Sequence, residues 1–265
     1  MGKIEQYYNC DYDEWGRLQR HRIEFEMTKR TMDKFIPEGA SILDVGGGPG
    51  RYSIYLAQKG HEVTLVDLCE KMVEQAAIHA QEAGVKLEAC IQGNVFDLDH
   101  ILPGNEYDVV LCMGPMYHLL EESQREEAVK QCMGLLKKGG LLIVAFISSY
   151  APMVECLKAY PEDISREKSS MLRFLEDGRY LPGAEDGFTD AYFINPEHIE
   201  VFMSRFNLER LKTMAVDGIG LIVEEKLVNL KEEDFQDWLD VFEAIASNHV
   251  VWGSCAHMLY VGRKS

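Results

Sequence analysis

A glycine-rich turn holds the residues whose types and spacing most clearly indicate chemistry. It spans residues 44–50 (DVGGGPG) and follows a short apolar run at residues 41–45. Glycines in such a turn let the backbone approach a ligand closely, and some of them supply a positive φ. In an open parallel sheet, ligands bind at the carboxyl ends of the strands, where the strand order reverses. Asp44, Gly46 and Gly48 are therefore candidate cofactor-binding residues.

The spacing of the glycines distinguishes between two classes of cofactor. A dinucleotide site needs G-x-G-x-x-G, with the pyrophosphate at the helix N-terminus. Counting from Gly46, Arg51 occupies the place of the third glycine, and counting from Gly48, Ser53 occupies it. The observed spacing is D-x-G-x-G-x-G, which argues against an NAD-dependent oxidoreductase.

A second acid supports nucleoside binding. Asp67 lies near the end of the apolar run at residues 61–68 (HEVTLVDL). A carboxylate at this place can accept two hydrogen bonds from ribose hydroxyls, in either class of cofactor. We expect Leu68 to pack on the adenine and Met72 to contribute. A solvent-exposed aspartate at a strand end is the alternative.

Strands and helices alternate around these residues. Gly84 ends one helical pattern, and Ser123 with Glu126 predicts a capping box that starts another. The strands are expected at residues 41–45, 61–68, 85–91, 107–113 and 141–147, and the helices at 51–59, 73–84 and 123–140. Such alternation predicts a parallel sheet covered by helices on both faces.

The pattern changes after residue 148. A helix is expected from Asn195, because an N-cap residue is followed by Pro196 and Glu197. A strand is expected at residues 208–216, a helix at 232–247 and a last strand at 256–261. We predict one domain over residues 1–265, made of a helical cap (1–40), a cofactor-binding core (41–147), a lid insertion (148–190) and C-terminal helices and closing strands (191–265).

The turn resembles motif I of the class I S-adenosylmethionine (SAM)-dependent methyltransferases, of the small-molecule type 11/25 kind. The resemblance covers residues 41–147 well, and residues 189–216 and 256–263 more loosely. It implies a Rossmann-like α/β fold whose seven-stranded sheet is mostly parallel, with strand 7 antiparallel beside strand 5 and helices on both faces. It also implies SAM as cofactor and S-adenosylhomocysteine as product.

The resemblance assigns further cofactor residues. In the family, residues after the third strand hold the adenine edge, and here these include Asn94 and Val95. Many members carry Asp where this chain has Asn94, and an amide can still bond the adenine amino group. After the fourth strand, backbone around Met113 and Gly114 is expected to face the cofactor.

The N-terminal segment resembles the leading helices that close over SAM in small-molecule members. Tyr8 and Arg20 are candidates to reach the carboxylate of the cofactor. Packing or surface roles stay open for both residues.

Methyl transfer from a sulfonium is an in-line displacement, so alignment and exclusion of water can supply much of the catalysis. A general base is needed only when the nucleophile arrives protonated. By resemblance, Tyr117 and His118 face the substrate pocket, and His118 is the first candidate for such a base. Tyr117, Tyr192 and His257 are weaker candidates, and a structural role stays open for each.

Composition narrows the class of acceptor. The 265 residues include 27 basic and 44 acidic side chains, for a formal net charge of −17. Such a surface repels polyanions. Residues 112–118 also resemble the N-P-P-Y motif of amino-directed enzymes, but Gly114 stands at the amide position. We therefore expect a small-molecule acceptor and no nucleic acid. A methyltransferase acting on nucleic acid or protein, and a non-catalytic SAM-binding protein, stay open.

Several expectations concern the setting of the protein. No apolar run approaches the roughly 20 residues of a membrane span, and the N-terminus lacks the features of a signal peptide. The seven cysteines, Cys10 among them, are dispersed and fit small core residues in a reducing compartment. We expect a cytoplasmic protein without a membrane partner or a metal site. The acceptor and the oligomeric state are not indicated.

Overall fold

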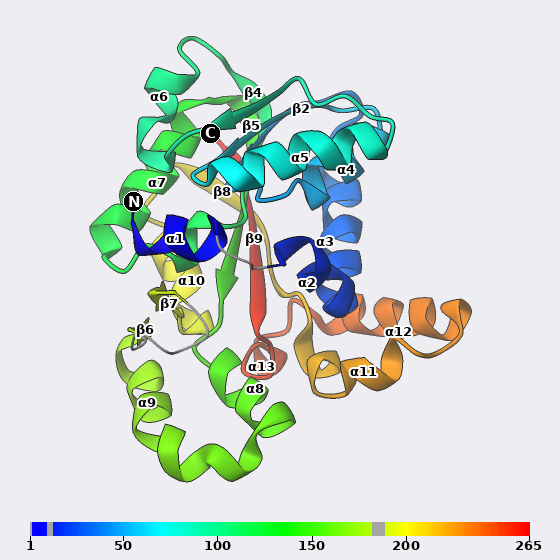
Figure 1. Cartoon of the computed structure of the whole chain (residues 1–265), viewed down its shortest axis with the longest axis vertical. Helices are drawn as coiled ribbons and strands as arrows, with labels where there is room; N and C mark the ends of the chain where they lie inside the picture. The colour runs from blue at the N-terminus through cyan, green and yellow to red at the C-terminus, as the bar shows by residue number, and fades with distance from the viewer. Residues whose placement is uncertain (1, 10–12, 182–188) are drawn as a thin grey trace.

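A seven-stranded sheet forms the centre of the protein (Figure 1). A computed structural model describes residues 2–9, 13–181 and 189–265. The strand order is β3-β2-β1-β4-β5-β9-β8, and β9 runs antiparallel to both β5 and β8 while the other neighbours are parallel. The strands are β1 (Ser41–Val45), β2 (Glu62–Asp67), β3 (Ala89–Gln92), β4 (Tyr107–Cys112), β5 (Leu136–Ile147), β8 (Leu208–Ala215) and β9 (His257–Lys264). The sheet predicted from the resemblance, with its antiparallel seventh strand, is confirmed.

Helices cover both faces of this sheet. Adjacent strand residues such as Ile42 and Leu43 are both fully buried but belong to two different cores, because successive side chains point to opposite faces. One core includes side chains of α3 (Arg22–Phe35), α4 (Arg51–Gln58), α5 (Glu70–Glu82) and α12 (Glu232–Ile245). The other includes side chains of α6 (Leu98–Ile101), α7 (Glu122–Gly134), α10 (Pro196–Met203) and α13 (His249–Trp252).

The remaining helices flank the carboxyl ends of the parallel strands. They are α1 (Lys3–Asn9), α2 (Glu14–Arg20), α8 (Ala151–Ala159), α9 (Ile164–Asp177) and α11 (Glu224–Leu227). In Figure 1, α8 and α9 lie beyond the tip of β5. A two-stranded ribbon of β6 (Arg179–Tyr180) and β7 (Ala191–Tyr192) follows them. The segment predicted to lack periodicity thus contains two helices, and its residues 182–188 lie outside the described part of the chain.

The start of α7 differs from its predicted capping box. The N-cap is Glu121, whose side chain accepts from the N3 backbone, and Gln124 bonds back to the backbone of Glu121. Ser123 and Glu126 both lie inside the helix instead. The helix starts earlier than predicted because the extended backbone of Glu121, at φ −90° and ψ 138°, leaves its carboxylate free to cap.

The end of α7 also differs from the prediction. The helix stops at Gly134, and Leu136 already pairs with Tyr107 of β4. Residues 137–140, which were expected to close the helix, therefore lie within β5. The pairing of β4 with β5 is irregular here, and Gly139 takes a positive φ of 79°. A glycine accommodates that backbone without strain.

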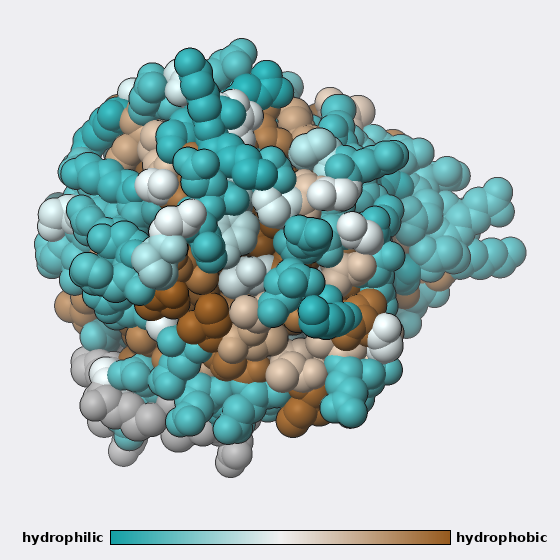
Figure 2. Space-filling view, turned by 90° about the horizontal axis from the view of Figure 1, so that it is seen from above, coloured by the Kyte–Doolittle hydropathy of each residue, from teal (hydrophilic) through white to brown (hydrophobic). Residues whose placement is uncertain are grey.

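The surface is mostly polar (Figure 2), and most of the described cysteines are buried, as the composition led us to expect. The face in Figure 2 is mostly hydrophilic, with a patch of apolar side chains on it. None of the helices in the described part of the chain combines the length and the apolarity that a membrane span needs. The free cysteines 69, 112, 132, 156 and 255 are buried and Cys90 is partly buried, whereas Cys10 lies outside the described residues.

The central strand β5 offers a test of the core with a matched control. Val144 is fully buried in one core, whereas Val250 on α13 is 87% exposed. Val144→Ala should lower the free energy of unfolding by about 2–3 kcal/mol, because it removes buried methyl groups and leaves a cavity. Val250→Ala should change it by less than about 0.5 kcal/mol. Urea denaturation checks both values, and equal effects at the two positions would contradict this packing.

Candidate functional site

A cleft of about 1640 Å³ opens at the carboxyl edge of the sheet. The glycine-rich turn, the ends of β2 and β4, and parts of α1, α2, α8 and α9 line it. The structure brings nearly all the predicted site residues into this one cleft: Tyr8, Asp44, Gly46, Gly48, Asp67, Leu68, Met72, Asn94, Val95, Met113, Gly114, Tyr117 and His118.

The glycine-rich turn packs directly against the loop after β4. Gly46, Gly48 and Gly50 all have positive φ, at 70°, 54° and 88°. A Cβ at Gly46 would lie 2.7 Å from Cδ of Pro115, and a Cβ at Gly114 would lie 2.8 Å from the carbonyl oxygen of Gly46. Side chains at either position would push the two loops apart. Glycine is therefore required at both positions, and without side chains the backbone of the turn is exposed to the cleft.

Asp44 is a buried carboxylate with one unsatisfied oxygen. It is 1% exposed, and its Oδ2 accepts a 2.7 Å hydrogen bond from the Ser53 hydroxyl. Its Oδ1 has no hydrogen-bond partner among the described residues. Burial raises the pKa of Asp44 to about 6, against an ordinary value of 3.8. A buried, unpaired acceptor is costly, so this oxygen suits a cationic donor supplied by a ligand.

Asp67 connects the end of β2 to the glycine-rich turn. Its Oδ2 accepts from the backbone N–H of Gly48 at 2.8 Å, and its Oδ1 accepts from that of Cys69 at 2.9 Å. Burial raises its pKa. Each carboxylate oxygen can accept a further hydrogen bond, so Asp67 is held in place while it keeps capacity for a ligand.

Asn94 occupies the expected place after β3. Its Oδ1 accepts from the backbone N–H of Phe96 at 3.1 Å, so it caps the short helix η1 (Val95–Asp97). The carbonyl oxygen of an amide can accept a second bond, and the amide nitrogen has two donors. The side chain is therefore oriented by its capping role and can still bond the edge of a base.

On the opposite wall, Tyr8 and His118 meet. The Tyr8 hydroxyl shares a 3.0 Å hydrogen bond with Nε2 of His118, and the ring of Tyr117 lies 4.7 Å from that of His118, centroid to centroid. Desolvation lowers the pKa of His118 to about 4. The imidazole is thus neutral at neutral pH, and α1 is joined to the loop after β4.

Arg20 and Tyr192 are the predicted residues that do not line the cleft: Tyr192 lies in a separate small pocket under the guanidinium of Arg125, and Arg20 lies on the surface. Its side chain is 61% exposed and lies 3.5 Å from Oδ2 of Asp13. Arg17, one helical turn earlier on α2, lines the cleft instead. Residues three apart on a helix are close neighbours on its surface, but Arg20 is the last residue of α2 and faces outward.

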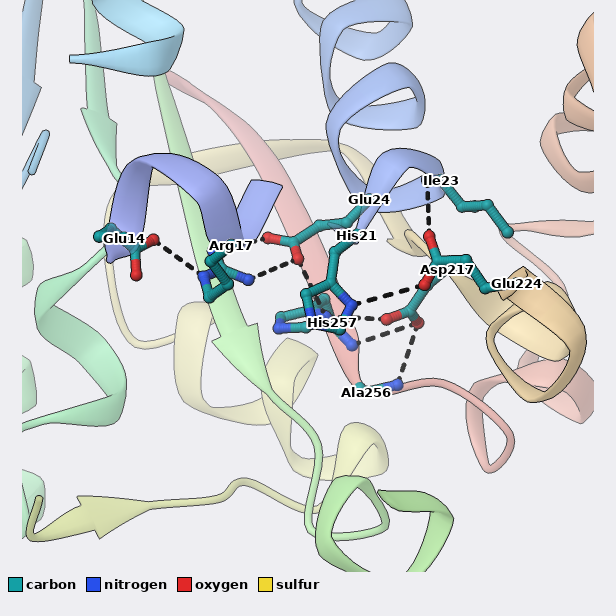
Figure 3. Close-up of polar contacts among 9 residues, drawn as sticks. All are labelled: Glu14, Arg17, His21, Ile23, Glu24, Asp217, Glu224, Ala256 and His257. Carbon is teal, nitrogen blue, oxygen red and sulfur yellow. Dashed lines mark hydrogen bonds and ion pairs between the residues drawn. The ribbon is translucent and has the colours of Figure 1, made fainter. Parts of the chain in front are cut away.

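Arg17 belongs to a cluster of buried charges that sequence reasoning missed (Figure 3). Its Nε donates to Oε1 of Glu14 at 2.9 Å, and its two Nη atoms donate to the two carboxylate oxygens of Glu24 at 2.8 and 3.2 Å. Burial opposes ionisation of Glu24, but Arg17 and His257 outweigh it and lower its pKa to about 2. The pair is therefore charged and bidentate.

The same cluster continues to the end of β8. Asp217 lies two residues after Ala215, the last residue of β8, and its Oδ2 lies 2.8 Å from Nδ1 of His257. The position of Asp217 in the sequence could have identified it, because it comes just after a predicted strand, in the same way that Asp67 ends β2. In the described part of the chain, no three His, Cys, Asp or Glu side chains are grouped to hold a metal ion.

The sequence of the core matches a known domain family. Residues 42–140 match the family model described as methyltransferase domain. The chain is 33% identical to a ubiquinone biosynthesis O-methyltransferase of Xanthomonas euvesicatoria pv. vesicatoria over 127 residues. This aligned segment is 48% of this chain and 49% of the relative. A ubiquinone biosynthesis O-methyltransferase of Xylella fastidiosa is 35% identical over 118 residues, or 44% of this chain and 46% of the relative. The chain spans about half the length of these curated relatives.

Solved structures share the fold over nearly the whole chain. A SAM-dependent methyltransferase of Methanosarcina mazei has a TM-score of 0.58 at 18% identity, over 88% of this chain and 96% of its own. Magnesium protoporphyrin IX methyltransferase of Synechocystis, with bound S-adenosylhomocysteine, has a TM-score of 0.59 at 17% identity, over 99% and 98%.

Together, the fold and the cleft define a class I methyltransferase architecture. More particularly, residues 42–140 match the methyltransferase domain model in sequence, and the solved structures share the fold of the whole chain.

The buried carboxylate of Asp44 makes a testable demand on stability. Its pKa is raised from 3.8 to about 6, so the folded state favours the protonated carboxyl. The contribution of Asp44 to the free energy of unfolding is therefore lost as the pH rises through 6. At pH 8 without ligand, Asp44→Asn should therefore raise the free energy of unfolding by about 1–3 kcal/mol. The gain should vanish at pH 4.

Urea denaturation at the two pH values measures this difference. Asp99→Asn is the control, because Asp99 is exposed on α6 and outside the cleft. A gain for Asp44→Asn that is the same at pH 4 and pH 8 would contradict the role given to burial.

Proposed function

We propose that this protein is a SAM-dependent methyltransferase that transfers a methyl group to a hydroxyl oxygen of a small molecule. The observation that carries the proposal is the pair of carboxylates beside the glycine-rich turn. Asp44 offers a buried oxygen without a partner, and Asp67 offers oxygens fixed by two backbone N–H groups. Together they suit one ligand with a cationic amino group and a ribose, and SAM carries both.

The other predicted residues complete the cofactor site. In the proposed arrangement Asp44 meets the amino group, directly or through a bound water, and Asp67 accepts from the ribose hydroxyls. The adenine lies beside β3 and the start of α5, and the glycine-rich turn and the loop after β4 present backbone to the methionine part. The proposed contacts are Gly46, Gly48, Leu68, Met72, Asn94, Val95, Met113 and Gly114, all of which line the cleft.

The N-terminal helices would cover the carboxylate of the cofactor. Tyr8 lines the cleft, and Arg17 takes the place that was predicted for Arg20. Because Arg17 already donates to two glutamates, only its remaining N–H groups are available for a ligand. The acid-rich wall that these helices form suits the positively charged cofactor.

When bound, SAM supplies a methyl group that its sulfonium has already activated. The protein then has to align the acceptor and keep water out. We propose that the segment 148–190 acts as the lid, since α8 and α9 line the cleft above β5. In the proposed arrangement the acceptor enters beside Tyr8 and His118, two polar groups that share a hydrogen bond.

The class of acceptor rests on two observations. Curated relatives of the core are named O-methyltransferases, which supports a hydroxyl acceptor. The net charge of −17 disfavours nucleic acid. We also propose a cytoplasmic location, because the cysteines of the described chain are free.

Calorimetric titration with SAM, S-adenosylhomocysteine and NADH tests the cofactor. The wild type should bind both adenosyl ligands and not NADH. Asp67→Asn should weaken their binding by about 10- to 100-fold, because it removes charge from an acceptor of ribose hydrogen bonds. Asp99→Asn is the control and should bind as the wild type does.

The outcomes separate three functions. Binding of NADH without SAM would overturn the proposal in favour of a variant dinucleotide site. Tight SAM binding without methylation of any small hydroxyl compound would leave a SAM-binding protein that is not an enzyme.

A further inference from the structure

His257 lies at the same edge of the sheet as the glycine-rich turn, although it begins a strand. Because β9 is antiparallel, its first residue pairs with Ile147 at the end of β5. The side chain lines the cleft and is 20% exposed. A histidine far from the turn in sequence is thus brought to the acceptor side of the cleft.

Asp217 fixes the tautomer of this histidine. Its Oδ1 accepts from the backbone N–H groups of Ala256 and His257, at 3.0 and 3.3 Å, so the carboxylate is held in place. Its Oδ2 lies 2.8 Å from Nδ1 of His257, which must donate to it. The lone pair of the neutral ring is then on Nε2. No contact between described residues involves Nε2, so it is available to a ligand.

The charged groups around His257 come from several elements (Figure 3). From α3, Oε2 of Glu24 lies 3.5 Å from Nδ1, and from α2, Arg17 and Glu14 lie behind Glu24. His21, between α2 and α3, has its ring centroid 6.4 Å away, and its Nδ1 lies 3.4 Å from Oε2 of Glu224 on α11.

These groups change the basicity of the ring. Burial lowers the pKa of His257, and the positive charge of Arg17 lowers it further. The carboxylates of Glu24 and Asp217 raise it by more, so the net shift of the pKa is upward. The pKa of His118, which also lines the cleft, is shifted downward to about 4. Opposite shifts of two titratable groups in one site are typical of divided roles.

We propose that His257 is the general base that deprotonates the acceptor hydroxyl, with Asp217 as its positioning residue. This inference rests on the proposed function. As the acceptor oxygen attacks the methyl carbon, the new C–O bond forms and the C–S bond breaks, with its electron pair going to sulfur. The hydroxyl proton moves to Nε2 of His257, and the resulting imidazolium is stabilised by Asp217 and Glu24 until solvent takes the proton.

His118 is less suited to this step. A base is most effective when its pKa lies near the working pH, and a value of about 4 makes His118 a weak proton acceptor. Its Nε2 is also engaged by the Tyr8 hydroxyl. Tyr8 and His118 can orient the acceptor, whereas His257 offers a free lone pair.

A series of catechols of increasing acidity, from catechol to 4-nitrocatechol, tests the proposal as methyl acceptors. His257→Gln should lower kcat/KM for catechol by about 100-fold or more. The loss should shrink along the series, because the most acidic member is largely ionised without a base. A loss of equal size for every catechol would overturn the proposal and indicate a structural role. His100→Gln is the control, since His100 is exposed on α6 and outside the cleft.

The pH dependence of kcat/KM in Asp217→Asn tests the positioning role of Asp217. In the wild type, the acid limb of kcat/KM should lie above the ordinary histidine pKa of about 6.5. Asp217→Asn should move it to lower pH, since removal of the negative charge lowers the pKa of His257. An unmoved acid limb would overturn the role of Asp217.

A measurement that does not depend on activity completes the test. In ¹⁵N-histidine NMR spectra with S-adenosylhomocysteine bound, His257 should be the Nδ1–H tautomer when neutral, with a raised pKa. The opposite tautomer or a lowered pKa would overturn the proposal. Calorimetry distinguishes the two failures: loss of SAM binding by the wild type contradicts the proposed function. Intact binding with no methylated catechol contradicts only the hydroxyl acceptor and its base.

Discussion

The bidentate ion pair of Arg17 and Glu24 is the interaction on which the shape of the cleft depends. It joins α2 to α3, and Glu24 in turn contacts His257 on β9. On its other side, Arg17 holds Glu14, whose Cγ lies 3.7 Å from where a Cβ of Gly48 would be. One line of charge contacts therefore runs from Glu14, which lies beside the glycine-rich turn, to β9. Each member of the pair has a second contact of opposite charge, Arg17 with Glu14 and Glu24 with His257, so the cluster acts as a unit.

The parallel sheet explains why these groups meet at one edge. Every parallel strand delivers its last residue to the same side, so Asp67 from β2 lines the cleft and Asp217 after β8 lies behind it, in contact with His257. The single antiparallel strand delivers its first residue there instead, which is how His257 joins them. The central strands β1, β2 and β4 are mostly apolar and buried on both faces. Chemistry is therefore confined to the strand ends.

Much of the fold and the cofactor side of the site could be predicted from the sequence, because their signals are local. The glycine spacing and the alternation of apolar runs gave β1, β2 and β4 to within a residue or two. The boundaries of α7 were less accessible, since Glu121 is an uncommon cap and residues 137–140 form an irregular part of a strand. The charge cluster was not accessible at all. Its members come from α2, α3, β9 and the region after β8, and only the folded sheet brings them together.

His118 and His257 show how one fold gives the same side chain different properties. His118 lies in a loop after β4 beside Tyr8 and Tyr117, where desolvation outweighs a hydrogen bond with the backbone of Asp190, so the ring is held neutral. His257 faces two carboxylates: Glu24, which pairs with Arg17, and Asp217, which accepts from backbone N–H groups. The difference lies in the neighbours and not in burial, because burial lowers the pKa of both. The acid-rich wall therefore has a use beyond attracting a cationic cofactor: it makes His257 a stronger base than His118.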